Sequence, residues 1–115
     1  GEPLNRNGFV SFYYAGYIFK GNNVSSANLF ATNHQETAES SNFSLTDPDY
    51  SLYEMNIGDT EMLEGLRKGL IGVQSGEMCE ILFTAKYGYG KRTFGIIPAN
   101  SALLYKIWVV GVSNE

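Results

Sequence analysis

Three tyrosines, two isoleucines and a proline gather in a glycine-bracketed stretch near the C-terminal end of the chain. The stretch comprises Tyr87-Gly-Tyr-Gly90 and, shortly after it, Gly95-Ile-Ile-Pro-Ala-Asn-Ser-Ala-Leu-Leu-Tyr105. Loops normally lie in water, so an apolar loop either tucks its aromatic rings under itself or forms the wall of a shallow pocket. The chemistry open to such a pocket is desolvation and shape-selective binding of an apolar group.

Side chains that carry acid–base, nucleophilic or metal chemistry form no pattern along the chain. The only histidine, His34, lies in a polar segment, where we expect a solvated loop residue. The only cysteine, Cys79, is flanked by apolar residues and is expected to pack rather than react. The carboxylates are dispersed, and Gly88 and Gly90 lack the lysine and the following helix of a phosphate loop. We therefore predict no metal site and no cofactor.

Composition narrows the class of protein. The chain has 115 residues, 43% of them hydrophobic, which suits a single domain over residues 1–115. Its net charge of −4 argues against nucleic-acid binding, and it has neither a basic amphipathic stretch nor a membrane-spanning apolar run. Its single cysteine leaves the redox compartment undecided. Location is unknown from this sequence; an exported, periplasmic or envelope-anchored protein is expected if a leader has been removed before Gly1.

Four strands and one helix must position the aromatic stretch. β-Branched and aromatic residues predict strands over residues 10–19, 50–57, 77–85 and 103–112. Residues 20–49 are mostly polar and are expected to form a long, irregular insertion loop. The loop is interrupted by one pair of adjacent apolar residues, Leu29-Phe30. A helix is expected to begin after Gly58, with four apolar residues on one face: Met62, Leu63, Leu66 and Leu70.

Only one helix is available for crossovers between successive strands, so the strands are expected to pair mainly antiparallel. The glycines Gly65 and Gly69 weaken that helix intrinsically, which predicts a close approach of backbone or ligand. We therefore predict an α+β fold, in which a twisted, mostly antiparallel sheet wraps around one short helix.

This order of motifs resembles the FKBP-type peptidyl-prolyl cis-trans isomerases over about 100 positions. The family's Tyr-x-Gly corresponds to Tyr14-Ala-Gly16, and its strand-to-helix junction corresponds to Gly58-Asp-Thr-Glu-Met-Leu-Glu-Gly65. Its Tyr-x-Tyr-Gly matches residues 87–90, and its Ile-Pro-x-x-x-x-Leu matches residues 97–103. The family's phenylalanine-aspartate-serine element is displaced by an insertion to Phe30-Ala-Thr-Asn33.

The resemblance implies an FKBP-like twisted sheet around a helix, with a pocket that takes a proline ring and the residue before it. Tyr89 and Tyr14 are then the candidate catalytic residues, and the Tyr89 hydroxyl and the Leu63 N–H correspond to groups that bind ligand carbonyls. The implied substrate-binding residues are Phe30, Tyr53, Met62, Leu63, Leu66, Ile96, Ile97 and Tyr105. Implied ligands are proline-containing polypeptides and macrolide inhibitors of the family.

Three departures from the family pattern weaken the expected catalysis. The family's aspartate falls at Ala31, and the tryptophan that floors its pocket falls at Leu66. The family also has a further strand before Val10, so we expect either a truncated chain or a sheet with one strand fewer. The resemblance therefore implies a weak peptidyl-prolyl isomerase. The alternatives are a non-catalytic binding or chaperone module and, more distantly, a structural piece of a larger envelope protein with its pocket closed by Phe30 or Phe94.

Overall fold

The computed structural model describes residues 2–19, 28–41, 50–59, 63–93 and 97–114. In chain order the elements are β1 (Phe9–Phe19), β2 (Leu29–Thr32), α1 (Gln35–Ser40), β3 (Tyr53–Asn56), α2 (Glu64–Leu70), β4 (Met78–Phe83), the short 3-10 helix η2 (Ala85–Tyr87) and β5 (Ala102–Ser113). The four predicted strands and the predicted helix are all present, with ends that differ by at most five residues.

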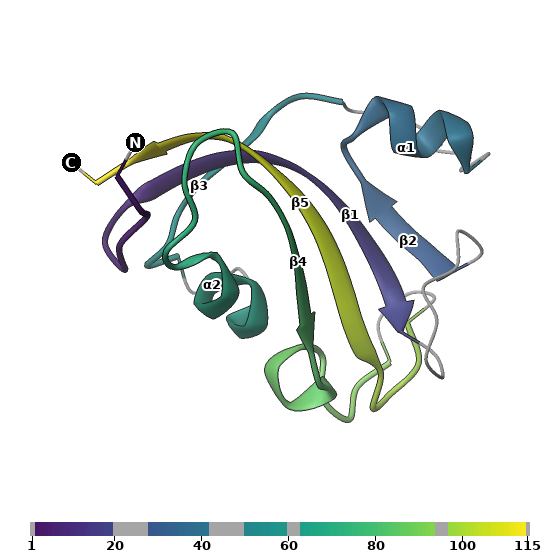
Figure 1. The fold of residues 1–115 in the computed structure, drawn as a ribbon. Coiled ribbons are helices and arrows are strands. Elements are labelled where there is room, and N and C mark those ends of the chain that lie inside the picture. The colour runs from purple at the N-terminus through teal and green to yellow at the C-terminus, as the bar shows by residue number, and fades with distance from the viewer. Residues whose placement is uncertain (1, 20–27, 42–49, 60–62, 94–96, 115) are drawn as a thin grey trace.

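One antiparallel sheet organises the described residues. Strands β1 and β5 form its centre, paired from Phe9↔Ser113 to Phe19↔Ala102. The order is β2-β1-β5-β4, and β3 pairs with the first part of β1. The sheet curls around α2, as Figure 1 shows. This arrangement confirms the predicted α+β fold, and we call the face of the sheet toward α2 the concave face.

Alternation along the two central strands builds the core. Val10, Phe12 and Ile18 of β1 are buried on the concave face, as are Ile107 and Val109 of β5. Helix α2 adds Leu66 and Leu70, which are 3% and 0% exposed. The apolar stripe of the helix therefore closes the concave side of the sheet.

Both glycines of α2 lie against side chains of β4, whereas the sequence predicted a close approach of backbone or ligand. A methyl group at residue 65 would overlap the ring of Phe83, and one at residue 69 would lie 2.5 Å from Cγ2 of Ile81. Bare backbone at these two positions lets the helix approach the strand more closely than any side chain would allow.

Two elements lie in the segment that was predicted to be an irregular loop, so that prediction is wrong for residues 29–32 and 35–40. Strand β2 pairs with the second part of β1, with Ala31 opposite Gly16. Helix α1 follows and contacts β2, and only its Ala38 is buried. Strand β2 extends the sheet on the side of β1 away from β5.

His34 is not a solvated loop residue, and that expectation is wrong. Its ring stacks on Trp108 of β5, with centroids 3.8 Å apart and planes 10° apart. Its Nδ1 lies 2.8 Å from the hydroxyl of Thr37. Trp108 alternates with buried Ile107 and Val109, so this stack lies on the convex face of the sheet, opposite α2.

The two ends of the described chain are joined by side-chain hydrogen bonds. Asn114 accepts a bond from the backbone N–H of Asn5 at 2.9 Å and donates one to the carbonyl of Pro3 at 2.9 Å. Leu4 is 1% exposed and exchanges backbone bonds with Gly72 and Val73. The first residues therefore pack along the body of the domain without forming a strand in the described part. No helix within the described residues is long and apolar enough to cross a membrane.

Candidate functional site

Four aromatic side chains from four strands meet on the concave face. Tyr14 of β1 lies 6.2 Å from Tyr53 of β3 and 6.2 Å from Tyr105 of β5, measured between ring centroids. Phe30 of β2 meets Tyr105 edge-on at 5.8 Å. We call these four residues the aromatic array. The Tyr14–Tyr53 and Phe30–Tyr105 contacts are edge-to-face, and such contacts fix ring orientations. All four are residues that the sequence predicted for the site.

Three phenol groups converge at this array. Burial raises the pKa of Tyr105 far above its ordinary value, and the neighbouring Tyr89 and Tyr14 raise it further. Burial also raises the pKa of Tyr89. Tyr89 and Tyr105 therefore remain protonated hydroxyls at neutral pH. The two predicted catalytic tyrosines both pack against the apolar cluster that contains Tyr105.

Aliphatic side chains form the base of the site. Leu66 of α2 and Ile97, just before β5, are each 3% exposed and pack with Tyr105 in one cluster. Leu63 is half-buried against the same cluster, at the N-cap of α2. Met62 and Ile96 lie outside the described residues. The expected open hollow for a pyrrolidine ring therefore stays a prediction.

Two residues that the sequence analysis did not select support Tyr105. Phe83 of β4 stacks on its ring, with centroids 5.9 Å apart and planes 10° apart. The second is Gly16 of β1, the strand that pairs with β5. A Cβ at this position would come within 2.8 Å of Cζ of Phe30 and 2.9 Å of Cε1 of Tyr105. The glycine of the Tyr-x-Gly motif thus leaves the space in which two array rings meet.

Asn33 fixes the backbone of Tyr14, and it too was not selected. It is 5% exposed, and its Oδ1 accepts the Tyr14 N–H at 2.6 Å. Its Nδ2 donates to the carbonyls of Phe12 and Ser51 at 3.4 and 3.0 Å. Strands β2 and β3 pair with the same side of β1 but leave a gap between them. The Asn33 bonds lie in this gap, where no strand pairs with β1 on that side. One side chain therefore replaces strand pairing where Tyr14 enters the site.

A compact turn holds Tyr89. The carbonyl of Ala85 accepts bonds from the N–H groups of Gly88 and Gly90 at 3.0 and 2.8 Å. The carbonyl of Tyr89 accepts one from Arg92 at 3.2 Å. Gly90 has a φ of +63°, a backbone conformation that glycine adopts without strain. The turn lets both Tyr87 and Tyr89 pack against the core of the concave face.

The chemistry of the assembled site is that of an apolar surface with hydroxyl donors. No group of three metal-ligating side chains is found within the described residues. Cys79 is half-buried in β4, and burial raises the pKa of its thiol, which disfavours the reactive thiolate. His34 lies on the opposite face of the sheet. The described residues of this surface offer desolvation and hydrogen bonding to a bound group.

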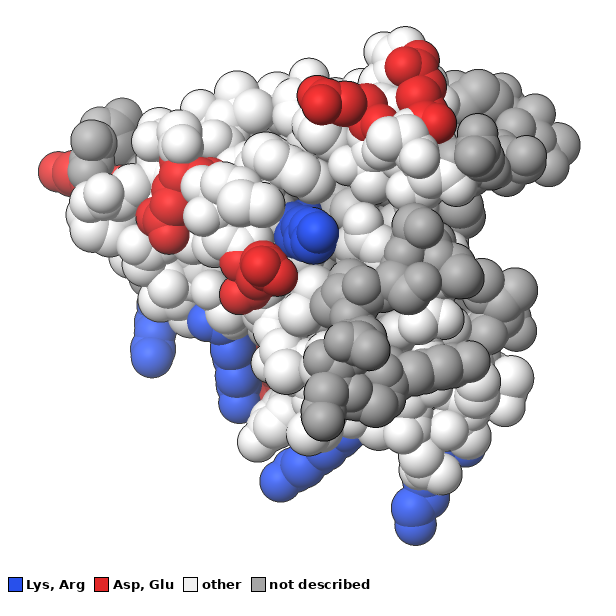
Figure 2. Space-filling model, turned by 45° about the vertical axis from the view of Figure 1, so that its right-hand side comes forward, with Lys and Arg blue, Asp and Glu red and all other residues white. Residues whose placement is uncertain are grey.

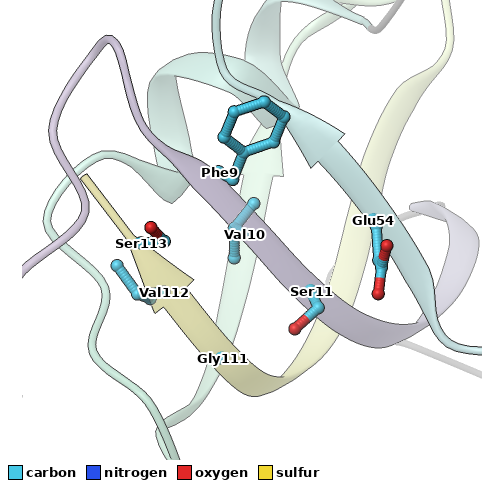
Figure 3. A pocket seen from close by; sticks show the side chains of 7 residues that line it. All are labelled: Phe9, Val10, Ser11, Glu54, Gly111, Val112 and Ser113. Carbon is cyan, nitrogen blue, oxygen red and sulfur yellow. The ribbon is translucent and has the colours of Figure 1, made fainter. Parts of the chain in front are cut away.

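A separate surface hollow lies at the other end of the central strands. It has a volume of about 430 Å³ and is shown in Figure 3. Its lining residues are Phe9, Val10, Ser11, Glu54, Gly111, Val112 and Ser113. None of them belongs to the aromatic array or to the aliphatic base, so this hollow is not part of the predicted site.

Comparison with known proteins gives consistent matches. Residues 2–110 match the model of a family described as FKBP-type peptidyl-prolyl cis-trans isomerase. The chain is 28% identical over 104 residues to FK506-binding protein 1 of Aspergillus oryzae, covering 90% of this chain and 82% of that protein. It is 32% identical over 66 residues to a peptidyl-prolyl cis-trans isomerase of Schizosaccharomyces pombe, covering 56% of this chain and 59% of that protein.

Among solved structures, the chain resembles FkpA from Escherichia coli with a TM-score of 0.71 and 18% sequence identity. The match covers 98% of this chain and 43% of the FkpA chain, so this chain spans less than half of that protein. The similarity concerns the fold.

Proposed function

Because this chain belongs to the family of FKBP-type peptidyl-prolyl cis-trans isomerases, we propose that it isomerises X–Pro bonds on the concave face, over Leu66 and among Tyr14, Tyr89 and Tyr105. The observation that supports this location is the convergence of three tyrosine side chains, Tyr14, Tyr89 and Tyr105, on one apolar cluster. Substrates are proline-containing polypeptides.

The proposed mechanism follows from the electronic structure of the amide. Rotation about an X–Pro bond faces a barrier of roughly 18–20 kcal/mol, because amide resonance must be broken. The planar amide is more dipolar than the twisted transition state. An apolar site that removes water from the carbonyl therefore disfavours the planar form more. A gain of about 5–7 kcal/mol would bring a process of tens of seconds to milliseconds.

In this proposal the tyrosines orient the substrate and the aliphatic residues hold its proline ring. The Tyr89 hydroxyl and the Leu63 N–H bind substrate carbonyls. The ring lies against Leu66 and Ile97, with Phe30, Tyr53, Met62 and Ile96 completing the walls. We extend the proposal to macrolides of the FK506 type, the ligand in the name of the Aspergillus oryzae relative.

The proposed activity is weak, and two positions account for this. Ala31 lies in β2 opposite Gly16, where the family has a carboxylate that organises the pocket. Leu66 replaces the flat tryptophan floor with a smaller, more mobile side chain. Neither position supplies a polar group, so catalysis depends on the phenols and on desolvation.

The direct test is NMR exchange spectroscopy on a short proline peptide, with and without the protein. We expect exchange above background, and Tyr89→Phe should lower kcat/KM about three- to tenfold, the effect of losing one hydrogen bond in the transition state. Tyr13→Phe is the matched control, because Tyr13 lies on the convex face near His34. No exchange above background at high protein concentration would contradict catalysis.

The pH dependence provides a second test. Burial raises the pKa values of Tyr89 and Tyr105 above 10, so neither phenol changes protonation between pH 6 and 9, and kcat/KM should be flat there. Above about pH 10 the unfolded chain loses these protons before the folded chain does. The free energy of unfolding should therefore fall with rising pH in that range. A bell-shaped profile of kcat/KM centred near neutrality would indicate a titrating catalytic group instead.

A further inference from the structure

The cationic residues of this acidic protein are unevenly distributed. Five of its eight lysines and arginines fall between residues 67 and 92, although the net charge is −4. These five are Arg67, Lys68, Lys86, Lys91 and Arg92, and we call them the cationic rim. On the face shown in Figure 2, cationic side chains project mainly from the lower end, and carboxylates lie mainly over the upper half. Figure 1 places the turn after β4 at that same lower end.

Tyr87 brings part of the cationic rim to the concave side. Its ring packs against the core that contains Tyr105 and Leu66. The ammonium groups of Lys68 and Lys86 lie 5.1 and 5.5 Å from its centroid, within cation–π range. Two positive charges from different elements are thus held at one aromatic ring beside the proposed site.

The effect on a nearby carboxylate shows the sign of the local potential. Lys68 is 2.9 Å from Glu64, and its hydrogen bond and charge lower the pKa of Glu64, with Arg67 and Lys86 lowering it further. Three cations therefore act on one exposed carboxylate. The region still has an excess of positive charge after that ion pair is counted, because residues 85–92 include Lys86, Lys91 and Arg92 but no aspartate or glutamate.

The turn that holds Tyr89 also places the remaining cations. Lys91 and Arg92 follow Tyr89 directly, and the bond from the Arg92 N–H to the Tyr89 carbonyl keeps them at the edge of the site. Both side chains are exposed, as is Lys86. If the proline of a bound peptide lies among Tyr14, Tyr89 and Tyr105, the residues next to that proline would lie along this edge.

We propose that the cationic rim makes the enzyme selective for prolyl segments with an acidic residue next to the X–Pro bond. The inference rests on the proposed function and specifies its substrate class. Exposed charges near a binding site attract oppositely charged ligands and raise the rate of encounter, an effect that salt screens. A glutamate or aspartate beside the proline would meet Lys86 and Arg92, whereas a lysine there would be repelled.

The experiment compares three peptides that differ only in one residue next to an X–Pro bond: glutamate, glutamine or lysine. Isomerisation is followed by NMR exchange, and binding of the same peptides by fluorescence anisotropy. We expect kcat/KM to be about three- to tenfold higher for the glutamate peptide than for the lysine peptide at low salt. The difference should shrink to less than about twofold at 0.5 M salt, as the Debye length falls.

Matched double variants separate the effect of the cationic rim from the effect of the protein's net charge. Lys86→Gln with Arg92→Gln should bring the glutamate-to-lysine ratio close to one. Arg6→Gln with Lys106→Gln removes the same charge elsewhere, and Lys106 lies over Tyr17 on the convex face. That control should keep the ratio. An equal loss in both variants, or no peptide preference in the wild type, would overturn the inference.

The isomerisation and binding measurements together distinguish failure of this inference from failure of the proposed function. If the glutamine peptide is isomerised but the three peptides do not differ, only the selectivity is wrong. If no peptide is isomerised, the proposed function is wrong, and the anisotropy measurements still decide whether the acidic peptide binds more tightly. Equal dissociation constants for the three peptides would then overturn the selectivity as well.

Discussion

Replacing Gly65 by alanine is expected to lower the free energy of unfolding by about 2–3 kcal/mol, the upper part of the range for overpacking a core. The new methyl group would lie 2.6 Å from Cδ1 of Phe83 and closer still to other atoms of the ring. That ring cannot move aside without cost, because it is buried and stacks on Tyr105. Either α2 shifts away from β4 or the stacking is lost, and both disturb the base of the site.

Chemical unfolding of the Gly65→Ala variant measures this cost, and Gly69→Ala is its matched control. Both substitutions gain the same intrinsic helix preference, about 1 kcal/mol, in the same helix. At residue 69 the methyl group meets the side chain of Ile81, which is only half-buried and has other rotamers. We expect the control to lose much less stability. Combining Gly65→Ala with Phe83→Leu should recover part of the loss, because the two sites are in contact. A Gly65→Ala variant as stable as the wild type would contradict the close packing of α2 on β4.

Asn33→Ala should also have a large effect, lowering the free energy of unfolding by about 2–4 kcal/mol. The side chain is buried and makes three hydrogen bonds, to Tyr14, Phe12 and Ser51. Its removal leaves one N–H and two carbonyls of the backbone without this partner, in a part of β1 that no strand covers on that side. Because Tyr14 is among those residues, kcat/KM of the folded fraction should fall as well.

Two further variants test that interpretation. Asn33→Asp keeps an acceptor for the Tyr14 N–H but loses both donors, so its stability should lie near or below that of Asn33→Ala at neutral pH. Asn56→Ala is the control, because Asn56 makes a local bond to the N–H of Gly58 at an exposed turn. Its loss should be below about 1 kcal/mol. Equal effects of Asn33→Ala and Asn56→Ala would show that the buried bonds contribute no more than an exposed turn.

The strands and the aliphatic core were predictable because their signal is local. Apolar residues alternate along β1 and β5, and the apolar spacing of α2 marks its buried side. The candidate site residues were chosen through motif order, and the structure brings four of them together: Tyr14, Phe30, Tyr53 and Tyr105.

The residues that escaped prediction depend on distant partners. Helix α1 has the sequence Gln-Glu-Thr-Ala-Glu-Ser with a single buried residue, so no apolar spacing marks it. Asn33 is polar and directly precedes the polar His34, so the local sequence indicates a loop residue. Its side-chain hydrogen bonds nevertheless reach residues 18 to 21 positions away in the chain. Nothing in the local sequence of Phe83 indicates that it supports Tyr105 from the next strand. Such roles are determined by the register of β1, β4 and β5, which the sequence alone did not specify.

The link between Asn114 and the segment Pro3–Asn5 has a practical consequence. Both ends of the described chain emerge together, at the opposite end of the molecule from the turn that carries Tyr89 (Figure 1). A short designed peptide could therefore join them, and folded domains often tolerate such circular permutation when their ends are close. New ends could then be opened at an exposed bend such as residues 75–76, and a label or tether placed there or at the present ends would leave the concave face accessible.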